Sequence, residues 1–143
     1  ITFTTHPYEH DPSNQDYGVE AATVLGIAPE QVFKTLMTMV DDDMVVAVVP
    51  VSGKLDFKAL ASALGGKKAT MADPAVAQRR TGYVLGGISP IGQKLTHRTV
   101  VDETIELFDT VFVSGGKRGF DIELSPDDLL RATDALLGAI ARD

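Results

Sequence analysis

The sequence predicts a single α+β domain with a mixed, largely antiparallel sheet flanked by short helices. First, its 143 residues are 44% hydrophobic and 23% charged, a balance typical of one globular domain. Second, several strand-like runs are short and are joined by tight polar turns, which favours hairpins. Third, helical segments lie between and after these strands without strict alternation, which argues against a purely parallel sheet.

The first 50 residues carry the signals of two short helices and a hairpin. Pro7 favours an edge position for the first strand, because proline has no N–H to donate to a ladder. Gly26 marks the end of a helix, and Pro29 suits the first turn of another. We therefore expect a strand at 1–8, a loop at 9–18, helices at 19–25 and 29–32, and strands at 33–40 and 44–49 that form a hairpin around the polar turn 41–43.

The remaining residues predict further short elements and one long terminal helix. Phe57, Leu60 and Leu64 share one helical face, and Asp73 and Ser125 are typical N-caps because each precedes a proline. We expect helices at 56–64 and 73–80, short strands at 83–85 and 99–102, a short helix or turn at 104–108, strands at 110–113 and 120–124 around a loop at 114–119, and a final helix from 125 to about 142 with an apolar stripe between 129 and 140.

Charge and cysteine content exclude several classes of function. The 13 Lys and Arg against 20 Asp and Glu give a net charge of −7, which disfavours tight, independent binding of nucleic acid, DNA included. The absence of cysteine excludes disulfides, thiolate metal sites and a cysteine nucleophile. His6, His10 and His97 lack the spacing of a zinc site, so we expect no metal site. No apolar run approaches the roughly 20 residues of a membrane-spanning helix, so we expect no membrane partner.

Lys34 is the first candidate for chemistry, because it lies within the apolar run 32–37. A desolvated ammonium loses part of its preference for the charged form, so such a lysine can act as a base, a nucleophile or an anion anchor. The alternative is an edge-strand lysine whose head group reaches water.

Two glycine-rich loops are the second candidate. Backbone N–H groups in the loop 86–93 could hold a carboxylate, a phosphate or a developing oxyanion. Gln93 stands where a Walker-type loop needs lysine, and the neighbours of Ser89 do not form a nucleophile elbow. The second loop, 114–119, has a basic tip, and Asp121 follows it on a strand. Both loops could also be ordinary turns; together with Lys34 they could line a small polar cleft.

Four runs of the sequence, at residues 8–11, 32–36, 72–94 and 113–124, carry a resemblance to a known family. They are similar to the motifs of YbaK-type Cys-tRNA(Pro) deacylases, in a superfamily that includes the editing insertion of bacterial prolyl-tRNA synthetases and free-standing Ala-tRNA(Pro) deacylases. The Gly-Gly-Ile-Ser-Pro and Ser-Gly-Gly-Lys-Arg-Gly forms favour the YbaK branch.

This resemblance implies trans-editing in the cytoplasm. Apolar pockets discriminate poorly between near-isosteres, so prolyl-tRNA synthetase attaches Cys by mistake, and a second enzyme hydrolyses the ester. In this branch the thiol of the substrate is thought to attack its own carbonyl, so no enzyme nucleophile and no cofactor are needed. The implied partners are aminoacyl-tRNA(Pro) and prolyl-tRNA synthetase, which would present the tRNA to this acidic protein.

The resemblance also implies roles for individual residues. Lys34 would contact the terminal adenosine phosphate or the ester, the loop from Gly86 would surround the carbonyl, the loop from Ser114 would form the opposite wall, and Asp121 would lie near the amino group. The implied catalytic set is Lys34, Gly87, Ser89 and Asp121, and the implied substrate contacts are Tyr8, Gly86, Ile88, Ser114, Gly115 and Gly116.

Some features leave alternatives open. The family usually begins with a further N-terminal helix, which we expect to be missing before Ile1. An Ala-specific or broad deacylase, a non-catalytic module that binds a tRNA end or a synthetase, and a small-anion or nucleotide-binding protein all fit the same motifs. Local cations could still grip the tRNA acceptor end: Lys67, Lys68, Arg79, Arg80, Lys94, Arg98, Lys117 and Arg118.

Overall fold

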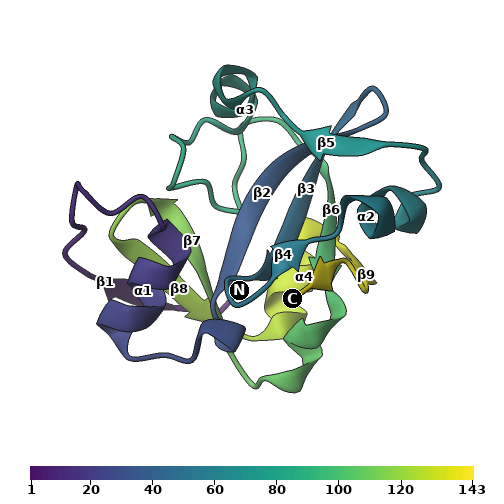
Figure 1. Cartoon of the computed structure of the whole chain (residues 1–143). Helices are drawn as coiled ribbons and strands as arrows, with labels where there is room; N and C mark the ends of the chain where they lie inside the picture. The colour runs from purple at the N-terminus through teal and green to yellow at the C-terminus, as the bar shows by residue number, and fades with distance from the viewer.

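A five-stranded mixed sheet forms the centre of the computed structural model, which describes residues 1–143 (Figure 1). Its strand order is β5-β2-β3-β6-β9, in which β2 and β3 pair antiparallel along their whole length, whereas β6 is parallel to both β3 and β9. These strands are β2 (Phe33–Val40), β3 (Asp43–Pro50), β5 (Ala69–Met71), β6 (Arg98–Asp102) and β9 (Leu136–Gly138).

A second, three-stranded antiparallel sheet lies beside the first, at the left of Figure 1. Its order is β1-β8-β7, and a single parallel bridge between Val32 and Phe112 joins the two sheets. The strands are β1 (Thr4–Pro7), β7 (Val111–Lys117) and β8 (Phe120–Leu124), and a two-stranded ladder pairs β4 (Lys54–Leu55) with β10 (Ala141–Arg142).

Short helices connect and cover the strands. They are α1 (Tyr17–Leu25), α2 (Phe57–Ala63), α3 (Pro74–Thr81) and α4 (Pro126–Thr133), with 3₁₀ turns η1 (Pro29–Gln31) and η2 (Glu103–Leu107). The N-caps follow the sequence: the carboxylate of Asp73 accepts hydrogen bonds from the N–H groups of Ala75 and Val76, and the hydroxyl of Ser125 accepts one from Asp128. None of these helices is long and apolar enough to cross a membrane.

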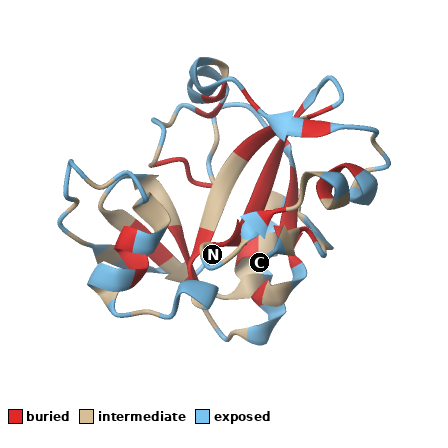
Figure 2. Ribbon diagram, viewed as in Figure 1, coloured by how far each residue is buried: buried red, intermediate tan, exposed pale blue.

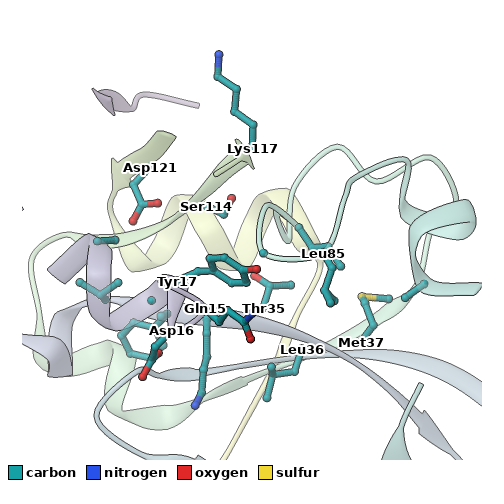
Figure 3. A pocket seen from close by; sticks show the side chains of 18 of the residues that line it. Gln15, Asp16, Tyr17, Thr35, Leu36, Met37, Leu85, Ser114, Lys117 and Asp121 are labelled. Carbon is teal, nitrogen blue, oxygen red and sulfur yellow. The ribbon is translucent and has the colours of Figure 1, made fainter. Parts of the chain in front are cut away.

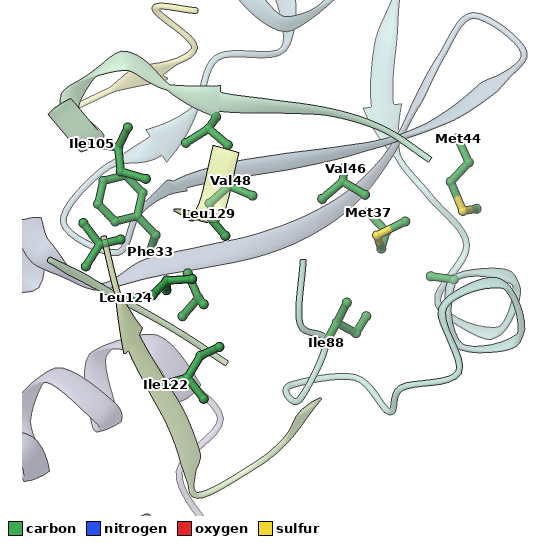
Figure 4. Close-up of a cluster of buried hydrophobic side chains, with 14 of the residues drawn as sticks. Phe33, Met37, Met44, Val46, Val48, Ile88, Ile105, Ile122, Leu124 and Leu129 are labelled. Atoms are coloured by element: carbon green, nitrogen blue, oxygen red, sulfur yellow. The ribbon is translucent and has the colours of Figure 1, made fainter. Parts of the chain in front are cut away.

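The core lies on both faces of the central sheet. Every residue of β3 from Met44 to Pro50 is buried (Figure 2), because the strand has neighbours on both edges and apolar layers on both faces. Alternate side chains of β3 point to opposite layers. Val46 and Val48 pack with Phe33 and Leu129 in the larger cluster (Figure 4), whereas residues such as Val49 pack with Leu60 against α2.

The predicted fold class is confirmed, as are the hairpin and the helices near 19–25, 29–32, 56–64 and 73–80. Gly26 ends α1 in the left-handed conformation. Several boundaries differ. The first strand covers only Thr4–Pro7, and α1 begins at Tyr17, inside the expected loop.

The predicted terminal helix is wrong beyond Thr133. Asp134 adopts a left-handed conformation and ends α4, and the chain continues as β9 and β10. Of the expected apolar stripe, Leu129 and Ile140 are fully buried, whereas Leu136 and Leu137 are exposed. Pairing with β6 overrides the helical spacing, since tertiary contacts outweigh local propensity.

Two smaller expectations are also wrong. Residues 83–85 form a turn rather than a strand, because the N–H of Gly87 bonds back to the carbonyl of Val84. The expected loop 114–119 is mostly strand: β7 continues to Lys117 through an irregularity between Ser114 and Lys117. The short strands β4, β5, β9 and β10 were not expected, since each has only two or three residues.

Candidate active site

A cavity of about 340 Å³ opens along one edge of β2. Val32 bridges β7 just before β2 begins, and β5 pairs with β2 from Thr38 to Val40, with one further hydrogen bond from the N–H of Ala72 to the carbonyl of Met37. Between these two neighbours, no strand pairs with this edge. The cavity therefore lies along the unpaired part of this edge, between the bridge to β7 and the pairing with β5.

The walls come from four separate parts of the chain. They are the segment that leads into α1, the β7–β8 hairpin, the turn at 85–88, and the start of α3. In Figure 3, Ser114 and Asp121 lie on one side of the opening, and Thr35 and Leu36 lie on the other. Six of the ten residues implied by the sequence line the cavity together: Tyr8, Lys34, Gly86, Ile88, Ser114 and Asp121.

The other four residues do not line the cavity. A Cβ on Gly87 would be 2.7 Å from the Cα of Lys117, so this glycine is needed where two loops touch. Ser89 is buried, and its hydroxyl accepts a hydrogen bond from the N–H of Ile91. Gly115 faces the ring of Phe120, and Gly116, which has a positive φ, faces Tyr83.

Asp121 is the buried charge of the site. It is 6% exposed and lies opposite His6 in the β1–β8 register. Burial raises the pKa of its carboxyl to about 7, and the nearby His6 offsets this only in part. The carboxyl therefore titrates near neutral pH, and a bound cation would favour its charged form.

Tyr8 stands near this carboxyl and stays protonated. Its burial, together with the charge of Asp121, raises the pKa of the Tyr8 hydroxyl to about 12. Its N–H donates to the carbonyl of Gly119 at 2.9 Å, which fixes the start of the loop beside β8. Tyr8 thus offers the cavity a hydroxyl donor.

Lys34 and Thr35 point to opposite faces of β2, and both line the cavity because the edge is open. Lys34 is half-buried and makes no salt bridge. The hydroxyl of Thr35 is buried and has no hydrogen-bond partner.

Sequence reasoning missed several lining residues. Thr35 is the neighbour of Lys34 on β2. Because Lys34 was expected at a strand edge, its neighbour could also have been predicted to line the cavity. Tyr17, Gln15 and Asp16 precede or begin α1, and no motif marked them.

The three histidines lie in separate groups. The Nε2 of His6 is 2.9 Å from Glu123, and the Nδ1 of His10 is 2.6 Å from the buried Glu20. His97 contacts Gln93 and Arg80, and burial lowers its pKa. None of the three lines the cavity, so none is placed to activate a hydroxyl there.

Comparisons with known proteins relate the chain to aminoacyl-tRNA editing proteins. The model of the aminoacyl-tRNA editing domain matches residues 12–132. The chain is 39% identical over 135 residues to EbsC of Enterococcus faecalis, which is provisionally assigned as a Cys-tRNA(Pro)/Cys-tRNA(Cys) deacylase; the match covers 93% of this chain and 82% of EbsC. It is 34% identical over 97 residues to a proline–tRNA ligase of Geobacter metallireducens, covering 68% of this chain and 16% of the ligase.

A solved structure has the same fold. A protein provisionally assigned as a trans-editing enzyme for prolyl-tRNA synthetase superposes with a TM-score of 0.86, over 99% of this chain and 87% of that one. The two sequences are 22% identical, so this likeness concerns the fold alone.

Proposed function

Since this chain belongs to the aminoacyl-tRNA editing domain family, we propose that it is a trans-editing deacylase that hydrolyses Cys-tRNA(Pro) in the cytoplasm. The observation that carries the proposal is the cavity itself, which combines a buried carboxyl, Asp121, with an unpaired lysine, Lys34. An aminoacyl ester has an ammonium group at one end and an anionic nucleotide at the other, so it matches both charges.

Asp121 would bind the α-ammonium group of the substrate. Its carboxyl has a pKa of about 7, so a bound ammonium would stabilise the charged form and draw the pair together. Lys34 would bind the phosphate or the ester oxygen of the terminal nucleotide, and the protonated hydroxyl of Tyr8 could donate a hydrogen bond to the substrate.

The turn at 85–88 would hold the ester carbonyl. Gly86 and Ile88 line the cavity, and their N–H groups make no backbone hydrogen bond, so both are free to donate to a developing oxyanion. The N–H of Gly87 already donates to Val84. We therefore give Gly87 and Ser89 supporting roles in shaping this turn, Ser114 the role of the opposite wall, and Gly115 and Gly116 supporting roles in the hairpin beside it.

The nucleophile would be the thiol of the substrate. The thiolate attacks the carbonyl carbon of its own ester, the new C–S bond forms as the C–O bond breaks, and the proton passes to the departing ribose oxygen. Water then hydrolyses the cyclic thioester to free cysteine. A thiol with a pKa near 8.5 ionises far more readily than a hydroxyl. In support, no cysteine is present, and the hydroxyl of Ser114 accepts a hydrogen bond from Gly116 and has no histidine base.

Single-turnover hydrolysis of Cys-, Ser-, Ala- and Pro-tRNA(Pro) tests this proposal. We expect rapid loss of Cys alone. Equal rates on Cys and Ala would instead indicate a broad deacylase, which the apolar lining from Phe33, Met37 and Ala77 would accommodate. No hydrolysis of any substrate, with retained binding of tRNA, would indicate a non-catalytic module.

We also propose that prolyl-tRNA synthetase presents the tRNA. The net charge of −7 disfavours independent binding of RNA. The exposed cations Arg79 and Lys94 lie in and after α3, a helix whose Pro74 and Ala77 line the cavity, and could contact the acceptor end. A pull-down with synthetase, tRNA or both measures this, and binding to tRNA alone at physiological salt would contradict it.

A further inference from the structure

Three segments that are distant in sequence meet beside the cavity through Arg118. Its Nε and Nη2 both donate to the carbonyl oxygen of Leu85, at 3.0 and 2.6 Å. Its guanidinium carbon lies 4.7 Å from the centre of the Tyr17 ring. The tip of the β7–β8 hairpin, the turn at 85–88 and the first residue of α1 are therefore held by one side chain.

Glycine at position 86 allows this contact. Gly86 has a φ of +84°, and a Cβ there would be 2.6 Å from the Tyr17 ring and 2.8 Å from the Nε of Arg118. A Cβ added to Gly87 would lie just as close to the backbone of Lys117, at 2.7 Å from its Cα. The two glycines thus pack the turn directly against the hairpin tip and Tyr17, and Leu85, Gly86 and Tyr17 all line the cavity.

His10 and Glu20 hold the Tyr17 ring in this contact. The His10 ring lies 5.6 Å from the ring of Tyr17, and the Nδ1 of His10 is 2.6 Å from the carboxylate of Glu20. Glu20 is buried in α1 and also accepts a hydrogen bond from the N–H of Asp11. A continuous chain of contacts therefore links the N-terminal loop, α1, the hairpin tip and the turn.

We infer that Arg118 is a positioning residue that holds the turn at 85–88 against Tyr17 and so sets the shape of the cavity, rather than a cation that grips RNA phosphates. Two of its five N–H donors, on Nε and Nη2, already aim at one carbonyl, and one face of the guanidinium covers an aromatic ring. Arginine suits this role because lysine has neither the planar fork nor the stacking surface. The inference rests on the proposed function, since the reaction that it positions is hydrolysis of an aminoacyl ester.

The test compares Arg118→Lys and Tyr17→Leu on two substrates, Cys-tRNA(Pro) and the 3′-cysteinyl ester of adenosine, which lacks the RNA body. We expect Arg118→Lys to lower kcat/KM about tenfold on both substrates, with an unchanged dependence on salt. The double variant should lose little more than the worse single variant, because both residues serve one contact. Arg131→Ala is the matched control, since Arg131 is exposed on α4 and does not line the cavity.

A second readout does not depend on activity. Hydrogen exchange of the amides at 84–92 should become faster in Arg118→Lys and stay as in wild type in Arg131→Ala. If Arg118→Lys loses activity on Cys-tRNA(Pro) but keeps full activity on the 3′-cysteinyl ester of adenosine, the residue contacts RNA and the inference is overturned. If the wild type hydrolyses neither substrate, the proposed function fails, and unchanged exchange at 84–92 would then overturn the inference separately.

Discussion

The β2–β3 hairpin and the segment 82–97 both border the cavity, yet they are stabilised in different ways. The hairpin is held by a full antiparallel ladder and by burial of β3 on both faces. The segment 82–97 has little regular structure and depends on side chains that bond to backbone: the Tyr83 hydroxyl donates to the carbonyl of Ile91, the amide of Gln93 to that of Ser89, and Arg118 to that of Leu85.

This difference separates stability from activity. A substitution in β3 removes buried apolar contacts and should destabilise the whole domain. A substitution in the segment 82–97 should move a wall of the cavity by a small distance and leave the central sheet intact, because this segment contributes no strand to that sheet. The following predictions test that division, from the largest expected effect to the smallest.

Lys34→Ala should lower deacylation roughly 1000-fold, because the cation that would stabilise the nucleotide or the oxyanion is lost. The variant should melt close to wild type, since Lys34 makes no salt bridge. Single-turnover hydrolysis and thermal melts measure the two effects, with the exposed Lys58→Ala on α2 as control. Wild-type rates in Lys34→Ala would refute the assignment.

Gly87→Val should abolish most activity, and Gly87→Ala should lower it, because a Cβ at this position meets the backbone of Lys117 at 2.7 Å. The turn must then move away from the hairpin tip. Activity and melting temperature should be compared with Gly138→Ala, where a Cβ meets atoms no closer than 3.5 Å. Full activity of a folded Gly87→Val protein would mean that the turn does not shape the site.

Asp121→Asn should lower activity roughly 100-fold, because the ammonium of the substrate loses its buried partner. It should also stabilise the protein above pH 7. The folded pKa of about 7 lies above the ordinary 3.8, so the native state binds more protons between these values and wild-type stability falls as pH rises through them. The melting temperatures of wild type and Asp121→Asn should therefore differ mainly at pH 8 and little at pH 4. Equal melting temperatures at both pH values would contradict a raised pKa for the buried carboxyl.

Val48→Ala should cost about 2 kcal/mol of unfolding free energy, since Val48 is fully buried in the larger core cluster. It does not line the cavity, so the folded protein should hydrolyse substrate near the wild-type rate. Denaturant titration measures the first effect, and activity per folded molecule measures the second. A large loss of activity without a loss of stability would break the division between core and walls.

Ser89→Ala and Ser114→Ala should change the rate least, by less than about threefold, if the substrate supplies its own nucleophile. Each hydroxyl already accepts a local backbone hydrogen bond, from Ile91 and Gly116 respectively. Single-turnover rates on Cys-tRNA(Pro) test this. Loss of activity in either variant, together with equal rates on Cys- and Ser-tRNA(Pro), would indicate an enzyme nucleophile.

Local signals predicted what local physics determines. Asp73 and Ser125 cap helices as expected, and the polar turn at 41–43 joins the hairpin, because caps and turns depend on neighbours in sequence. Leu136 and Leu137 have helical spacing, yet they lie in β9, since pairing with β6 is a long-range contact that no local pattern reveals.

The site divides in the same way. Lys34 could be found because it is an isolated charge in an apolar run, and Asp121 because it follows a glycine-rich loop on a strand. Tyr17 and the positioning role of Arg118 could not be found in the sequence, because they depend on three segments that meet only in the fold. The close approach of the Lys117 backbone to Gly87 could not be found either, because it joins two loops that are distant in sequence.

The open edge of β2 has one more consequence. From Phe33 to Leu36 the sheet lacks a neighbouring strand, a gap of four residues or about 13 Å along the strand. The cavity occupies the place of an absent strand segment, between the last pairing with β7 and the first pairing with β5. The length of the opening is therefore set by strand lengths rather than by the bulk of single side chains. In the antiparallel register that pairs Thr38 with Met71, extending β5 by three residues would close half of the gap, and shortening β5 would admit a longer ligand while the β2–β3 hairpin stayed unchanged.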